Sequence, residues 1–139
     1  MNDFKLDSRL AADTMPVAAL ELCELRLMED ARWPWLVLVP KRQNTVEIHD
    51  LEEAGQALLA RETSLAAAVL KDLTGCEKIN SAALGNIVRQ LHVHVVARTE
   101  GDPNWPGPIW GFGSRVAYEP GAAEAFVEKL RAALLPKIL

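Results

Sequence analysis

The sequence has few cysteines, no long apolar run and no excess of positive charge, and each shortage excludes a class of protein. Cys23 and Cys76 stand alone, outside any metal or redox spacing, so we expect two reduced and mostly buried thiols. No apolar stretch approaches the roughly 20 residues that span a bilayer. The formal net charge of −4 argues against bulk nucleic-acid binding, which needs a basic surface, but it is compatible with one anionic small ligand.

A secretory signal is also lacking, because the first seven residues carry acids and no apolar core follows them. We therefore expect a cytoplasmic protein. The 139 residues suit one domain with a real core, and the 50% apolar and 24% charged residues match an ordinary globular protein.

The apolar patterns predict an α+β domain with a mostly antiparallel sheet, one long helix and a C-terminal helix. Alternation or short apolar runs predict strands at 20–29, 36–40, 76–82 and 87–98. Residues 51–73 have helical periodicity after an Asp50–Glu53 capping box, and Pro120 opens the last helix. Residues 1–100 form the expected domain, with the Trp-, Pro- and Gly-rich loop and helix of 101–139 packed on it. The predicted buried stripe of the long helix is Leu51, Ala54, Leu58, Leu65, Val69 and Leu73.

Two of the three histidines lie in the last predicted strand. Successive strand residues point to opposite faces, so Gln90, His92 and His94 are predicted to form one polar row facing away from the core. Neighbours in such a row are about 7 Å apart, so one phosphate-sized group can touch two of them.

The segment around these histidines resembles the signature of the histidine-triad (HIT) family, in which three histidines alternate with apolar residues and two apolar residues follow. Here the segment reads Gln90-Leu91-His92-Val93-His94-Val95-Val96, with glutamine in place of the first histidine. The resemblance covers about residues 4–100, including the strand at 36–40 and the basic pair after it. Upstream, Asn80, Gly85, Asn86 and Val88 stand where the family usually has Asn, Gly, Gln and Val.

This resemblance implies a nucleotide-binding phosphoramidase, hydrolase or nucleotidyl transferase, usually a homodimer, that uses covalent catalysis and needs no metal or other cofactor. By position, His92 would be the nucleophile, since an imidazole is partly neutral near pH 7 and attacks through one nitrogen. His94 would contact the transferred phosphoryl group or protonate the leaving group. Asn86 would donate to phosphate oxygens, and Asn80 would lie at the phosphate or ribose edge.

Besides Asn86, the sequence departs from the family at three positions. Gln90 and Gln43 stand where relatives carry supporting histidines, and we expect the two amides to contact each other. An amide still donates and accepts hydrogen bonds, but it does not titrate. Ile87 replaces a Ser or Thr, so only its backbone amide remains for phosphate.

Further nucleotide contacts are predicted with less specific signals. Glu29 or Asp30 would accept the ribose hydroxyls, and Arg98 would neutralise a phosphate, although a solvated strand-end arginine is an equal alternative. Trp33 and Trp35 could stack on a base, but we favour a core role. Trp105 and Trp110 either close over the active site or pin their loop, and we favour the second.

Other interpretations exist for the two histidines and for the function of the protein. His92 and His94 could be a solvent-facing pair or two zinc ligands, although no acid or thiol lies nearby in sequence. His49 is expected at the surface. The main alternative to an enzyme is a non-catalytic nucleotide-binding module, because two supporting histidines are replaced. A protein-interaction domain is a third possible class of function. The base and the leaving group are left open.

Overall fold

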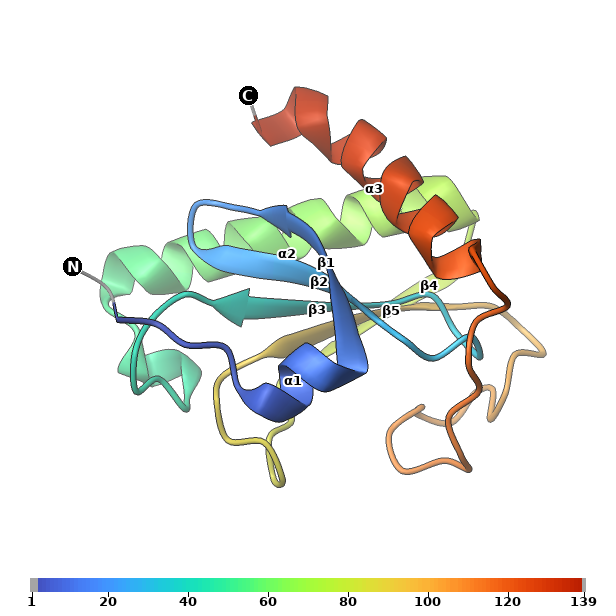
Figure 1. The fold of residues 1–139 in the computed structure, drawn as a ribbon, viewed down its shortest axis with the longest axis horizontal. Helices are drawn as coiled ribbons and strands as arrows, with labels where there is room; N and C mark the ends of the chain where they lie inside the picture. The colour runs from blue at the N-terminus through green and yellow to red at the C-terminus, as the bar shows by residue number, and fades with distance from the viewer. Residues whose placement is uncertain (1–2, 139) are drawn as a thin grey trace.

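A computed structural model describes residues 3–138 as a five-stranded antiparallel sheet in the order β1-β2-β3-β5-β4, with three helices around it (Figure 1). This confirms the predicted α+β class. None of the described helices is long and apolar enough to cross a membrane. Along the chain the elements are α1 Ser8–Asp13, β1 Thr14–Ala19, β2 Cys23–Met28, β3 Trp35–Pro40, a 3-10 turn at Ile48–Asp50, α2 Glu53–Thr74, β4 Lys78–Ala82, β5 Val93–Arg98 and α3 Ala122–Ile138.

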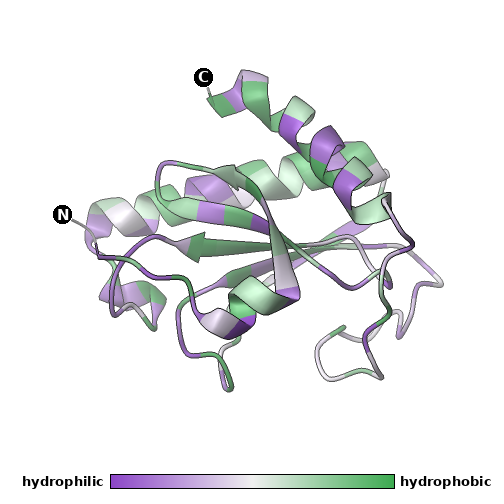
Figure 2. Cartoon of the chain, viewed as in Figure 1, coloured by the Kyte–Doolittle hydropathy of each residue, from purple (hydrophilic) through white to green (hydrophobic). Residues whose placement is uncertain are grey.

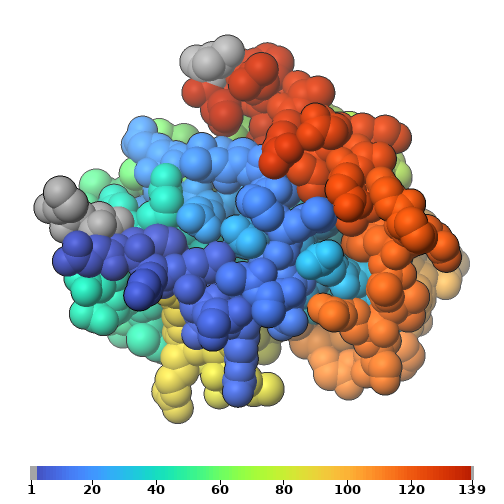
Figure 3. Space-filling view, in the orientation of Figure 1, coloured from blue at the N-terminus to red at the C-terminus, as the bar shows by residue number. Residues whose placement is uncertain are grey.

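The sheet is covered on both faces, and the two covers differ. α2 and α3 pack on one face and enclose the main core, to which β5 contributes Val93 and Val95 (Figure 1). On the other face the N-terminal segment packs against Val37 and Val39 of β3, and it crosses the front of the molecule in Figure 3. The central strands are accordingly apolar along most of their length (Figure 2). All six residues of β5 are buried, so its polar side chains face protein.

The N-terminal hairpin was only half predicted. The strand expected at 20–29 is β2, which alternates buried and half-buried residues as the pattern indicated. α1 and β1 were missed. β1 is an edge strand with Pro16 next to a register shift opposite β2, and proline within a run weakens a strand signal.

The long helix exists, but it begins later than predicted, and its buried stripe was predicted only in part. Asp50 accepts hydrogen bonds from the backbone amides of Val46 and Glu47, so it caps the 3-10 turn, and α2 begins at Glu53. The charged Glu62 is buried because its carboxylate accepts from the amides of Leu22 and Cys23 at 2.8 and 2.9 Å. Of the predicted stripe, Leu51 and Val69 are buried and Leu58 and Leu65 are half-buried against the core, whereas Ala54 and Leu73 are exposed. The buried residues of α2 are Gly55, Leu59, Glu62, Ala66, Val69 and Leu70.

The histidine strand is shorter than predicted, which changes the expected polar row. Residues 87–92 are irregular, and β5 begins at Val93. The Leu91 amide donates to the carbonyl of Thr45, so the chain is held to the β3–α2 connection before it enters the sheet. Gln90 is therefore outside the strand. His92 directly precedes the strand and His94 lies within it.

Arg98, at the far end of β5, anchors the loop that follows. Its guanidinium is 1% exposed, and all five N–H groups are used. The Asp102 carboxylate accepts two hydrogen bonds at 2.9 and 2.8 Å, and Asn80 and the carbonyls of Gly107 and Pro103 accept the rest. Trp105 lies against the same guanidinium.

Replacement of Arg98 by methionine should destabilise the protein by about 3 kcal/mol, because it leaves Asp102 without its partner in a mostly buried position. Urea unfolding of Arg98→Met measures this loss. Arg61→Met on the exposed side of α2 is the matched control and should change the free energy of unfolding little. Equal effects of the two substitutions would contradict the anchoring role.

Candidate active site

His92 and His94 lie side by side under a cover of aromatic side chains. Their ring centroids are 4.9 Å apart in an edge-to-face arrangement, and the residues are only 5% and 6% exposed. The predicted row facing away from the core is thus reduced to two residues and is buried, because the N-terminal segment and the loop after β5 cover this face of the sheet. The alternative of two solvent-facing histidines is excluded by this burial.

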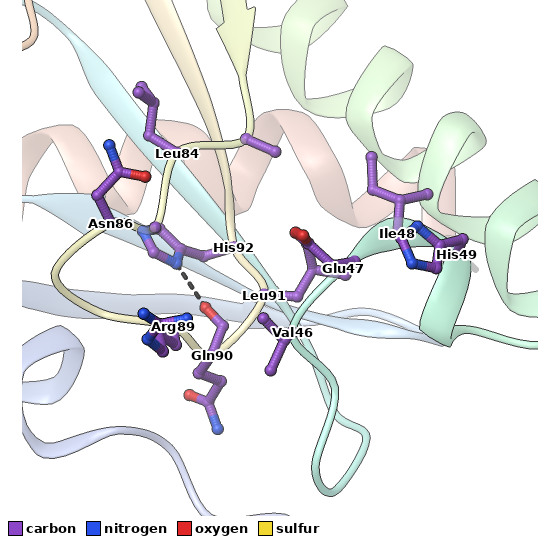
Figure 4. A pocket seen from close by; sticks show the side chains of 12 residues that line it. Val46, Glu47, Ile48, His49, Leu84, Asn86, Arg89, Gln90, Leu91 and His92 are labelled. Atoms are coloured by element: carbon purple, nitrogen blue, oxygen red, sulfur yellow. Dashed lines mark hydrogen bonds between the residues drawn. The ribbon is translucent and has the colours of Figure 1, made fainter.

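A single hydrogen bond sets the tautomer of His92. Its Nδ1 lies 2.7 Å from the carbonyl oxygen of Gln90, as Figure 4 shows by the dashed line. A carbonyl only accepts, so Nδ1 carries the proton. In the neutral ring Nε2 therefore keeps its lone pair, which is the form that a nitrogen nucleophile requires.

His94 has the opposite arrangement. Its Nδ1 lies 2.9 Å from the indole nitrogen of Trp35, which is a donor only. Trp110 contacts the ring from the loop after β5, with centroids 5.6 Å apart. Burial, with a smaller contribution from the neighbouring His92, lowers the pKa of His94 from 6.5 to about 3. His94 is thus neutral at physiological pH and carries its proton on Nε2.

A hollow of about 500 Å³ opens beside His92. In Figure 4, Asn86 and Leu84 lie near the imidazole on one side, and Glu47, Ile48 and His49 form the opposite wall. The wall residues come from the 3-10 turn before α2, and the others come from the β4–β5 connection. A second hollow of about 430 Å³ also reaches His92, and Asn86, Ile87 and Trp110 line it. The site residues predicted at 86, 87 and 92 therefore border a common space.

Gln90 contributes its backbone to the site, and its side chain turns elsewhere. The amide oxygen accepts from the backbone nitrogen of Asp7 at 2.9 Å, and the amide nitrogen donates to the carbonyl of Lys5 at 2.8 Å. The expected contact with Gln43 is not among the hydrogen bonds of residues 3–138, where Gln43 is exposed. That expectation was wrong because both ends of the Gln90 amide hold the N-terminal segment.

Of four other predicted nucleotide contacts, three have different partners in the structure and the fourth lies elsewhere. Arg98 has no N–H group left for phosphate, and it occupies the amide oxygen of Asn80. Asp30 is 2% exposed, and its carboxylate accepts from the Arg32 side chain and backbone. Glu29 borders a separate hollow with Tyr118. Arg98, Asn80 and Asp30 hold loops in place, and the hollow beside Glu29 is not lined by His92, so the structure gives no support to their predicted contacts with ribose or phosphate.

Sequence reasoning favoured core and loop roles for the tryptophans, and two of them also contact His94. Trp35 was assigned to the core, yet its indole reaches His94, while Trp33 does pin the loop by donating to the carbonyl of Pro103. Trp110 closes over His94, contrary to the favoured expectation, whereas Trp105 pins its loop at Arg98. The alternation of β3 could have indicated the contact between Trp35 and His94. It puts the side chain of Trp35 on the same face of the sheet as Val37, and Val37 pairs with His94 across the sheet.

The described residues around the two histidines supply too few ligands for a zinc ion. Among residues 3–138 no group of three or more His, Cys, Asp and Glu side chains is placed to hold a metal ion. The Nδ1 atoms of both histidines are also committed to hydrogen bonds.

The fold and the histidine pair are those of an established class. The HIT domain profile matches residues 9–101. The chain belongs to the HIT family, whose members are generally nucleotide hydrolases or transferases.

Solved bacterial structures resemble the whole chain, including the part after residue 101. A histidine triad protein from Sinorhizobium meliloti is 54% identical with a TM-score of 0.93, and the match covers 96% of this chain and 99% of that one. A histidine triad protein from Bradyrhizobium japonicum is 45% identical, covers 94% and 97%, and has a TM-score of 0.91. A third, from Marinobacter aquaeolei, is 40% identical, covers 98% of each chain and has a TM-score of 0.93. No match was found among curated proteins.

The Gln90 amide can be tested by substitution with methionine, which keeps the length of the side chain and removes both hydrogen bonds. We expect a loss of about 1–2 kcal/mol in the free energy of unfolding and faster hydrogen exchange at the Asp7 amide. Gln43→Met is the matched control, since that side chain is exposed. Unchanged exchange at Asp7 would show that Gln90 does not hold the N-terminal segment.

Proposed function

We propose that the protein transfers the nucleotidyl group of a nucleoside phosphoramidate or a related nucleotide to His92 and then to water or another acceptor. The observation that carries this proposal is the hydrogen bond from His92 Nδ1 to the Gln90 carbonyl. It leaves Nε2 as the free lone pair of a ring that borders two hollows. The family membership supports the same chemistry in its general form.

The reaction has two displacements at phosphorus. In the first, the Nε2 lone pair forms a bond to the α-phosphorus, and the bond to the leaving group breaks with its electron pair on the leaving atom. His92 then carries a positive charge, and the Gln90 carbonyl stabilises the proton retained on Nδ1. In the second, a water oxygen attacks phosphorus, the P–Nε2 bond breaks, and the water proton passes to solvent. The leaving group takes a proton from water, and the products are the nucleoside monophosphate, the protonated leaving group and the free enzyme.

The surroundings of His92 fit an anionic group. Asn86 is exposed beside the ring and has an amide to donate, and Ile87 lines the same space. Arg89 lines the larger hollow and supplies a positive charge. Such donors hold a phosphate that is close enough for in-line attack.

The first test is release of AMP and GMP from their phosphoramidates by the wild type and by His92→Asn. Asparagine keeps a donor for the Gln90 carbonyl and lacks the nucleophilic nitrogen, so kcat should fall by about 1000-fold or more with little change in fold. Mass spectrometry of the wild type mixed with substrate should detect one nucleotidyl group on the peptide that contains His92. Circular dichroism and thermal unfolding control for the fold of the variant.

The same experiment separates the enzyme from a binding module. If neither protein releases a nucleotide while calorimetry detects AMP binding, the covalent mechanism is rejected and the nucleotide-binding module replaces it. Equal release by the wild type and the variant would show that another residue is the nucleophile.

A further inference from the structure

The ring of His94 is enclosed by groups from three parts of the chain. Trp35 of β3 lies on one side with ring centroids 5.6 Å apart, and Trp110 of the loop after β5 lies at the same distance. His92 is the third neighbour, at 4.9 Å. The β4 residue paired with His94 across the sheet is Ala82, which has no polar side chain. Among the described residues, His92 is thus the titratable group that faces this imidazole.

The direction of the Trp35 hydrogen bond determines where the His94 proton lies. An indole N–H donates and never accepts, so at 2.9 Å the facing Nδ1 has to be the unprotonated nitrogen. A cationic His94 would carry an N–H at both ring nitrogens, and one of them would point at the indole N–H. Protonation therefore requires this hydrogen bond to break inside a site that is 6% exposed.

Two further effects act in the same direction. Desolvation in this enclosed position disfavours the charged ring, and His92 adds to it; together they lower the pKa of His94 to about 3. When His92 carries a nucleotidyl group its ring is cationic, and a second positive charge 4.9 Å away would be repelled. The conditions of the reaction thus also keep His94 neutral.

We propose that Trp35 is a positioning residue that holds His94 as the neutral Nε2–H tautomer, so that His94 serves the reaction as a fixed hydrogen-bond donor and does not protonate the leaving group. The part about the reaction rests on the proposed function, whereas the tautomer of His94 does not. The proposal keeps the first expected role of His94, contact with the phosphoryl group, and replaces the second, protonation of the leaving group. Leaving groups then have to take their proton from water at the open side of the hollow.

The tautomer is measured without any activity assay. In long-range ¹H–¹⁵N spectra of protein with labelled histidine rings, His94 should show an unprotonated Nδ1 and a protonated Nε2, with no titration between pH 8 and pH 5. Trp35→Phe keeps an aromatic ring and removes the donor, so a population with the proton on Nδ1 should appear and the pKa should rise. A wild-type spectrum with a proton on Nδ1, or a Trp35→Phe spectrum identical to the wild type, overturns the proposal.

Trp110→Phe is the matched control for the aromatic packing. It also removes an indole N–H beside His94, but that N–H is buried and has no hydrogen-bond partner. The tautomer of His94 should therefore be unchanged in Trp110→Phe. If Trp35→Phe fails to fold, the wild-type spectrum and the Trp110→Phe spectrum still decide whether Nδ1 is the acceptor.

Kinetics tests the second half of the proposal. In Trp35→Phe, kcat should fall about tenfold with a small change in KM, because the donor is misdirected in part of the population. The wild-type profile of kcat against pH should show no loss of activity at high pH from deprotonation of His94. A changed tautomer with an unchanged kcat would overturn the role of His94 as donor. Failure of the proposed function is distinguished from this, since it shows as nucleotide release that survives His92→Asn or as no release by the wild type.

Discussion

The polar side of β5 is buried beneath the N-terminal segment and the loop after β5, and each polar group on that side therefore needs a partner within the protein. His94 accepts a hydrogen bond from Trp35, and Arg98 donates to Asp102 and Asn80. His92, just before the strand, donates to the Gln90 carbonyl. The loop after β5 is held at one end by Arg98, and at the other end it brings Trp110 onto His94. The site is thus assembled by the requirement that these groups be satisfied.

Two chemically identical side chains acquire different properties from one hydrogen bond each. At His92 a carbonyl requires the proton on Nδ1, and at His94 an indole requires it on Nε2. The ring of His92 then keeps a lone pair on Nε2, and the ring of His94 keeps an N–H there. Spacing along the chain carries no information about this difference.

Gln90 illustrates how a triad position can be reused. Its carbonyl accepts a hydrogen bond from His92 Nδ1, and its amide holds Lys5 and Asp7. The orientation of His92 is therefore coupled to the N-terminal segment through one residue. A titrating side chain is not needed for either contact, because an amide supplies both a donor and an acceptor at every pH.

The α+β class, β2, β3, β4, the two long helices and the histidine motif were predicted from the sequence, because alternation, helical periodicity and a spaced motif are local properties of the chain. The sequence alone also determined that His92, His94 and Asn86 belong together, since they lie within nine residues. Only the tertiary structure decided that Trp35 is the partner of His94, that Glu62 is buried, and that Arg98, Asn80 and Asp30 hold loops in place. Those roles depend on contacts between residues distant in the sequence, and burial selects the partner by geometry and by donor or acceptor character.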